Sequence, residues 1–140
     1  MEQRIEPLAG ADARDVFEKR RWVREHYDAG SQHTYETLEG KLHLLDVILK
    51  QAWIDPDDTL KLQCLGIAFG DALAQELGLT WVIVEDDYGR DPALILEGTS
   101  IVSFPLTAIS KRVQAGETVD VRSLFRSACE TIARLRDEQA

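Results

Sequence analysis

Hydrophobic residues recur at helical spacing through the first third of the chain. A weak apolar stripe over residues 12–27 ends before Gly30, and glycine is favoured just beyond the C-terminus of a helix. Over residues 35–53, apolar side chains recur every three or four positions, which is the spacing of an amphipathic helix. The pattern therefore predicts two helices in this part of the chain.

A third helix is predicted from residue 55 onward. Asp55 can cap free backbone N–H groups, Pro56 suits the first helical position, and Gly78 marks the end of the helix. Gly66 and Gly70 lie four residues apart inside this segment, so both fall on one face. Because glycine inside a helix costs about 1 kcal/mol relative to alanine, we expect both to pack closely against the sheet or another helix.

The period changes from helical to alternating in the middle of the chain. Three short apolar runs occupy residues 81–85, 93–97 and 101–104, and turn-forming residues predict a turn at 88–92. Such short connections allow only antiparallel pairing of consecutive strands. Both faces of the strands carry apolar side chains, so we expect helices to cover part of each face.

Two more helices are predicted after the strands. Residues 106–115 form a short helical segment that ends at Gly116, and Asp120 is placed to cap a longer final helix. The order is therefore three N-terminal helices, a three-stranded antiparallel meander and two C-terminal helices, which is typical of an α+β protein. At 140 residues the chain has the size of one domain, so we expect residues 1–140 to form a single α+β domain.

Composition and charge narrow the classes of partner. The formal net charge is −9, which repels phosphate backbones and anionic lipids but attracts a basic protein. The basic run at residues 19–24 is interleaved with acidic residues and predicts a solvated helix face. No apolar run approaches the roughly 20 residues needed to cross a bilayer, and the start lacks the apolar core of a signal peptide. We therefore expect a cytoplasmic protein with a protein partner, and neither nucleic acid nor membrane.

One local concentration of carboxylates could carry chemistry. Glu85, Asp86, Asp87 and Asp91 crowd the first strand's end and the following turn, where they could ligate a hard cation or act as acid and base. An ordinary charged turn is the favoured interpretation. Strand alternation sends neighbouring side chains to opposite faces, and Arg90 can neutralise part of the charge.

The usual catalytic and ligand-binding motifs are missing. The histidines are not spaced as in a zinc hydrolase helix, the helix glycines do not form a phosphate-binding loop, and no serine lies in a nucleophile elbow. We therefore expect no cofactor, no metal and no catalytic residues.

Trp22 is the tryptophan with the best case for exposure. It lies among charged residues, and an exposed tryptophan beside arginines is typical of a binding hot spot, although a buried anchor is the alternative. The candidate binding residues are Trp22, Glu85, Asp86, Asp87, Tyr88, Arg90 and Asp91.

Two stretches carry a resemblance to a known family. Residues 65–71, Leu-Gly-Ile-Ala-Phe-Gly-Asp, and residues 77–93, which contain Thr-Trp-Val-Ile-Val-Glu-Asp-Asp-Tyr-Gly, resemble the bacterial domain-of-unknown-function family 3806. The likeness extends more weakly to the final helix, so that it spans about residues 60–137. The resemblance implies a bacterial origin and a compact α+β unit, and it assigns no chemistry and no site residue.

Three functions remain open. The favoured hypothesis is a non-enzymatic protein-binding module, in its most concrete form an immunity or antitoxin-like protein whose acidic surface occludes a bacterial effector. The alternatives are a small metal-dependent hydrolase that uses the carboxylates of residues 85–91, and a homo-oligomeric structural or regulatory domain.

Overall fold

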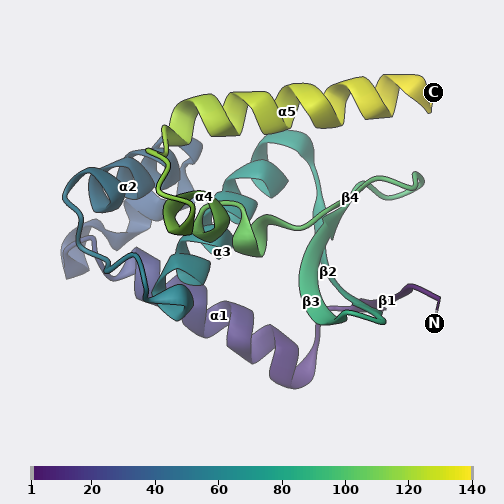
Figure 1. Ribbon diagram of the computed structural model, residues 1–140, viewed down its shortest axis with the longest axis horizontal. Helices are drawn as coiled ribbons and strands as arrows, with labels where there is room; N and C mark the ends of the chain where they lie inside the picture. Colours follow the sequence, from purple (N-terminus) through teal and green to yellow (C-terminus); the bar gives the residue numbers. More distant parts are fainter. Residues whose placement is uncertain (1, 140) are drawn as a thin grey trace.

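A four-stranded antiparallel sheet forms one side of the molecule in the computed structural model, which describes residues 2–139. The strands are β1 (Arg4–Pro7), β2 (Thr80–Asp86), β3 (Gly89–Ile95) and β4 (Val102–Ser103), in the spatial order β1-β2-β3-β4. Figure 1 shows most of the helices gathered on the other side of the molecule, with α5 running across the top. The predicted α+β class is therefore confirmed.

The helices are arranged around α3. In chain order they are α1 (Gly10–Arg24), the 3-10 helix η1 (Ala29–Glu36), α2 (Leu38–Lys50), α3 (Thr59–Leu77), the 3-10 helix η2 (Pro105–Thr107), α4 (Ser110–Gln114) and α5 (Val121–Glu138). α3 contacts α1, α2, η2, α4 and α5. Within the described residues, no helix is both long enough and apolar enough to cross a membrane.

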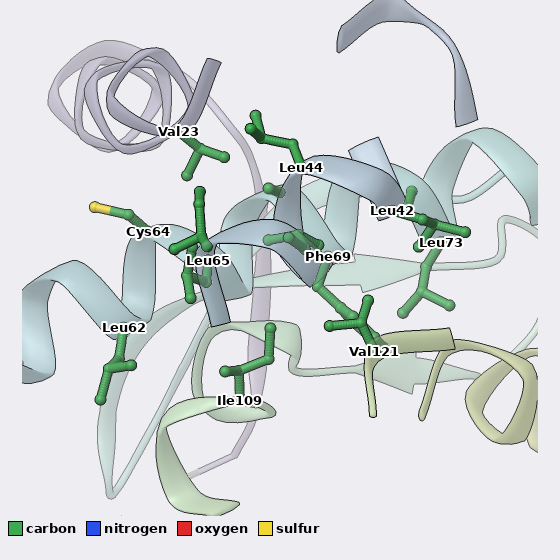
Figure 2. Packing of buried hydrophobic residues seen from close by; sticks show 14 of the residues in the cluster. Val23, Leu42, Leu44, Leu62, Cys64, Leu65, Phe69, Leu73, Ile109 and Val121 are labelled. Atoms are coloured by element: carbon green, nitrogen blue, oxygen red, sulfur yellow. The ribbon is translucent and has the colours of Figure 1, made fainter. Parts of the chain in front are cut away.

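One hydrophobic cluster joins the helices to the sheet. Its fully buried members include Val23 of α1, Phe69 of α3, Leu94 of β3 and Val121 of α5. Figure 2 shows side chains from α1, α2, α3 and α5 converging near Phe69. Burial of such side chains contributes roughly 1.5–3 kcal/mol each, so this cluster is the main source of stability.

The sheet has a different cover on each face. Trp81 and Leu94 pack against the main cluster. On the opposite face Val82, Val84 and Ala93 form a second cluster that contains strand residues alone. The expectation of helical cover thus holds for the first face only.

The predicted three-stranded meander is wrong in its number of strands. β2, β3 and β4 form the meander, and β1 adds a fourth strand in which Ile5 pairs with Val84. β1 is only four residues long and three of them are charged or proline. It exists because it pairs with a strand far along the sequence, and the local pattern carries no sign of that pairing.

The β2–β3 turn also lies earlier than predicted. It consists of Asp87 and Tyr88, and β3 begins at Gly89 instead of after Pro92. The φ of Gly89 is +131°, a value that glycine adopts without strain. Proline is tolerated in this strand because β4 pairs only with the last two residues of β3. Pro92 pairs with Ile83 of β2, and its other edge has no partner strand among the described residues.

Two of the predicted helices are divided in the structure. The helix expected over 35–53 separates into η1 and α2, because Thr37 has extended backbone angles and accepts a hydrogen bond from Gly40 N–H. The segment 106–115 likewise separates into η2 and α4. Asp120 caps α5 through its side chain, as predicted.

α3 begins later than predicted. Asp58, not Asp55, is the cap and accepts a hydrogen bond from Lys61 N–H. Asp55 accepts instead from Asp57 N–H, in the turn before the helix. Each aspartate in this run can accept from a backbone N–H, so the sequence alone does not determine which one caps the helix.

Candidate functional site

The β2–β3 hairpin carries six of the seven predicted binding residues. They are Glu85 and Asp86 at the end of β2, Asp87 and Tyr88 in the turn, and Arg90 and Asp91 in β3. The Tyr88 ring projects into solvent, with 97% of the residue exposed. Asp86 Oδ1 accepts a hydrogen bond from Tyr88 N–H at 2.8 Å, which fixes the turn that presents the ring.

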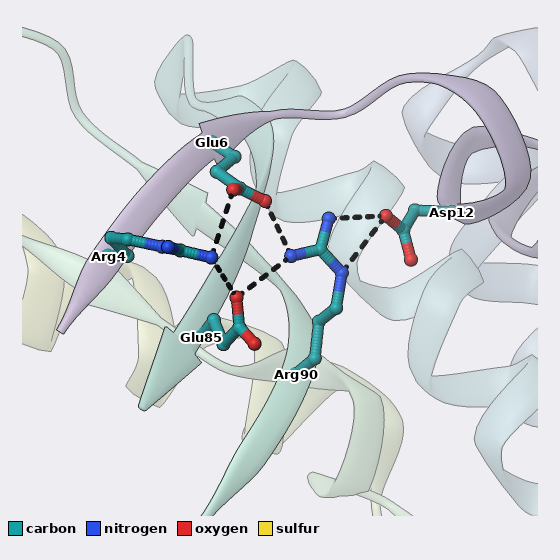
Figure 3. Close-up of polar contacts among 5 residues, drawn as sticks. All are labelled: Arg4, Glu6, Asp12, Glu85 and Arg90. Atoms are coloured by element: carbon teal, nitrogen blue, oxygen red, sulfur yellow. Dashed lines mark hydrogen bonds and ion pairs between the residues drawn. The ribbon is translucent and has the colours of Figure 1, made fainter. Parts of the chain in front are cut away.

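An ion-pair network surrounds the end of this hairpin next to its turn (Figure 3). Arg90 Nη2 lies 2.7 Å from Asp12 Oδ2 of α1, and Arg90 Nη1 contacts Glu6 of β1 and Glu85 of β2. Arg4 pairs with the same two glutamates. The hydrogen bonds that Arg90 donates to Asp12 and Glu6 raise the pKa of its guanidinium. Glu85 and Arg90 therefore connect three strands and a helix.

Alternation along the strands separates the remaining carboxylates. Asp91 pairs across the sheet with Val84, so it lies on the same face as Val84 and Asp86, whereas Glu85 lies on the opposite face. Asp91 forms no ion pair with any residue that the structure describes. The hairpin thus presents Tyr88 together with the Asp91 carboxylate, which is outside the network of Arg90.

The carboxylates of the hairpin do not converge on one point. Among residues 2–139, no group of three or more histidine, cysteine, aspartate or glutamate side chains could hold a metal ion. Glu85 faces two arginines and Asp86 accepts from the turn backbone. The geometry of the hairpin therefore gives the metal-dependent hydrolase hypothesis no support.

Trp22 lies away from the hairpin. It is ten residues beyond Asp12 on α1, which is roughly 15 Å along a helix axis at 1.5 Å per residue. Trp22 is half-buried against the main cluster, and its ring meets His26 edge-on at 4.5 Å between centroids. His26 stacks in turn on Trp53, which is 54% exposed. The more exposed tryptophan of this aromatic group is Trp53, although its neighbours in the sequence do not mark it as exposed.

A second polar cluster was also missed. The carboxylate of Asp71, 9% exposed, accepts four hydrogen bonds. Oδ2 accepts from Arg20 Nε at 2.7 Å and Tyr35 Oη at 2.6 Å, and Oδ1 accepts from Arg20 Nη2 at 2.9 Å and Trp81 Nε1 at 3.0 Å. Burial, together with the Asp71 carboxylate, raises the pKa of Tyr35, so its hydroxyl remains a donor.

Lys41 lies beside this cluster and is only 6% exposed. Its Nζ donates to Gln75 Oε1 at 2.6 Å and lies 4.9 Å from the centroid of the Tyr35 ring. Burial lowers the pKa of the Lys41 ammonium. Lys41, Gln75, Arg20, Tyr35, Glu36 and Asp71 line a cavity of about 380 Å³. No local pattern in the sequence indicates this site, because its residues come from four separate helices.

Comparison with known proteins identifies a family and a fold. A family model described as a domain of unknown function, DUF3806, matches residues 41–125. A crystal structure of a protein from Bacteroides thetaiotaomicron VPI-5482 has a similar fold, with a TM-score of 0.74 at 18% sequence identity. The similarity covers 91% of this chain and 47% of that chain, so this chain spans about half of that protein's length. No curated protein matches the sequence.

Proposed function

Since the chain belongs to the DUF3806 family, whose description names no activity, we propose its function from the geometry of its surface. The protein is a non-enzymatic binding module of the cytoplasm, and its acidic β2–β3 hairpin docks on a basic protein. In its most concrete form it is an immunity or antitoxin-like protein that occludes the basic cleft of a bacterial effector.

The exposure of Tyr88 is the observation that carries this proposal. Tyrosine is among the residues that contribute most to binding when a partner buries them, and almost the whole residue is open to solvent. The hydrogen bond that Asp86 accepts from Tyr88 N–H fixes the turn, and the ion pairs of Arg90 connect the hairpin to β1 and α1. A surface that is already ordered loses little conformational entropy on binding.

The charge around Tyr88 indicates the class of partner. The acidic residues in or beside the hairpin are Glu6, Asp12, Glu85, Asp86, Asp87 and Asp91, and the basic residues are Arg4 and Arg90. The local formal charge is therefore −4. Such a surface attracts a basic partner and speeds its association, and salt screens the attraction over about 10 Å at 0.1 M.

Affinity capture from a cell extract of the source organism, at low and at moderate salt, tests this function. We expect a basic protein in stoichiometric amount, with less retained at the higher salt concentration. A Tyr88→Ser bait should lose at least tenfold in affinity for that protein, since hot-spot residues contribute about 2 kcal/mol or more. Replacing Asp87 and Asp91 by asparagine should weaken binding and reduce its dependence on salt.

The matched control neutralises an equal number of acidic residues elsewhere. Asp137→Asn and Glu138→Gln change exposed residues at the end of α5, and this bait should bind like the unmodified protein. Retention that is equal for all baits would overturn the proposal. Capture of a second copy of this chain alone would favour the homo-oligomeric alternative instead.

A further inference from the structure

The cavity between α1, η1, α2 and α3 contains cationic N–H groups that donate to no residue in the range 2–139. The Lys41 ammonium has three N–H groups, and its one hydrogen bond to a described residue goes to Gln75 Oε1. Arg20 uses Nε and Nη2 on Asp71, and its Nη1 makes no hydrogen bond to the part of the chain that the structure describes. Both side chains line the cavity.

The carboxylates of the cavity leave Lys41 without a close counterion. The Asp71 carboxylate is taken up by four donors and is paired with Arg20. The Glu36 side chain is 72% exposed and its ion pair, at 4.0 Å, is with Arg24. Lys41 forms no ion pair with any described residue, and its hydrogen-bond acceptor, the Gln75 amide, is neutral.

An ammonium held in this way is costly to the folded protein. Burial of a charge without a paired counterion is unfavourable, and burial outweighs the attraction of Asp71 and Glu36 to lower the pKa of Lys41. The cavity therefore offers N–H groups of Lys41 and Arg20 for which no described residue supplies an acceptor, as an anion site does.

The size and chemistry of the cavity then indicate the ligand. A volume of about 380 Å³ corresponds to roughly ten waters at about 30 Å³ each, which is ample for a carboxylate or a phosphate group. Arginine and lysine are the side chains that proteins use for such oxygens. We propose that this cavity binds a small oxyanion, a carboxylate or a phosphate group, between the Lys41 ammonium and the free edge of the Arg20 guanidinium.

This site is independent of the function proposed for the hairpin. Its residues come from helices α1, η1, α2 and α3, and none of them belongs to the ion-pair network of Arg90. The hairpin can therefore fail as a docking surface without any effect on the oxyanion site, and the reverse also holds.

Titration of the full chain with inorganic phosphate and, separately, with acetate tests the proposal by NMR at constant ionic strength. We expect saturable shifts of the Arg20 Nε–H and of the amides around Lys41 with at least one probe. Phosphate alone would identify a phosphate site, acetate alone a carboxylate site, and both together a general oxyanion site. The absence of saturable shifts at these residues with both probes would overturn the proposal.

Lys41→Met removes the ammonium but keeps a side chain of similar length, and it should weaken binding at least tenfold. Lys50→Met makes the same change on an exposed residue of α2 and should leave binding unchanged. If Lys41→Met does not fold, Lys41→Gln and Lys41→Arg are compared, and only the arginine variant should retain binding. Equal affinity in the methionine or glutamine variant and the unmodified protein would contradict the assignment.

Discussion

Asp71 connects three elements to α3 through one carboxylate. Arg20 reaches it from α1, Tyr35 from η1 and Trp81 from β2. Hydrogen bonds to an ionised acceptor are about twice as strong as neutral ones. A substitution that removes the carboxylate also leaves Arg20 without its counterion in a partly buried position. The free energy of unfolding should therefore fall by more than the loss of the hydrogen bonds alone.

Asp71→Asn should accordingly destabilise the protein strongly. The amide keeps the shape of the carboxylate but removes the charge that Arg20 faces, and breaking a buried ion pair costs roughly 3 kcal/mol or more. Urea unfolding followed by circular dichroism measures the change in the free energy of unfolding. Glu18→Gln removes a carboxylate from an exposed pair with Arg21 and should change stability by less than about 1 kcal/mol. Equal effects of the two substitutions would show that the Asp71 contacts contribute little.

Single residues were predictable where the reason was local. Asp120 caps α5, and Arg90 lies against Glu85, as the sequence suggested. Asp71 and Lys41 gave no signal, because their partners come from other helices and from β2. Charged neighbours in the sequence indicated Trp22 as a candidate for exposure. Its own side chain nevertheless packs partly against the main cluster, because neighbouring residues on a helix point in different directions.

At the scale of elements, two glycines allow α3 to pack closely against η2 and the Trp81 ring of β2. A Cβ at Gly66 would lie 2.2 Å from the backbone oxygen of Leu106, and one at Gly70 would lie 2.5 Å from the Trp81 ring. The predicted close packing is confirmed, with η2 and β2 as the neighbours. Because the contact at Gly66 is with backbone, the neighbour cannot move aside by a change of rotamer.

Gly66→Ala should therefore destabilise the protein although alanine is the better helix former. The gain in helix propensity is about 1 kcal/mol, and overpacking costs about 1–3 kcal/mol or more, so at a backbone clash this close we expect a net loss of about 2 kcal/mol. Chemical denaturation measures this loss. Gly30→Ala is the control, since a Cβ there would meet nothing within 4 Å, and it should have little effect. A stabilised Gly66→Ala variant would mean that η2 adjusts freely.

Elements were predictable in type and less so in their limits. Periodicity identified the helical and extended parts of the chain, because each period follows from the geometry of the backbone. The limits of α3 depend on which of several aspartates caps it, and β1 depends on pairing with β2. The hairpin turn lies earlier than predicted because Pro92 is tolerated at a strand edge that β4 does not pair with. The residues around Pro92 in the sequence do not show whether that edge is paired.

At the scale of the whole molecule, one cluster connects nearly all the elements. Its members extend from Val23 in α1 through Phe69 in α3 to Ile132 in α5, and they include Leu94 of the sheet. The smaller cluster on the other face contains strand residues alone. The first cluster therefore provides the hydrophobic contact between the sheet and the helices, beside the polar contacts of Trp81 with Asp71 and of Arg90 with Asp12. The single domain predicted from chain length is consistent with this arrangement and can be tested directly.

Unfolding should be a single cooperative transition, because the sheet and the helices share the same core. Replacing Trp22 and Trp53 by phenylalanine leaves Trp81, which lies on β2 and donates to Asp71 of α3, as the reporter of the contact between sheet and helices. Its fluorescence and the helical circular dichroism should then change with the same midpoint in urea. An earlier change of the Trp81 signal would separate the sheet from the helices as an independently unfolding unit. If the fluorescence and circular dichroism curves coincide, the sheet and the helices unfold together. The order of the β2–β3 hairpin, on which the proposed binding depends, then relies on the same core as the helices.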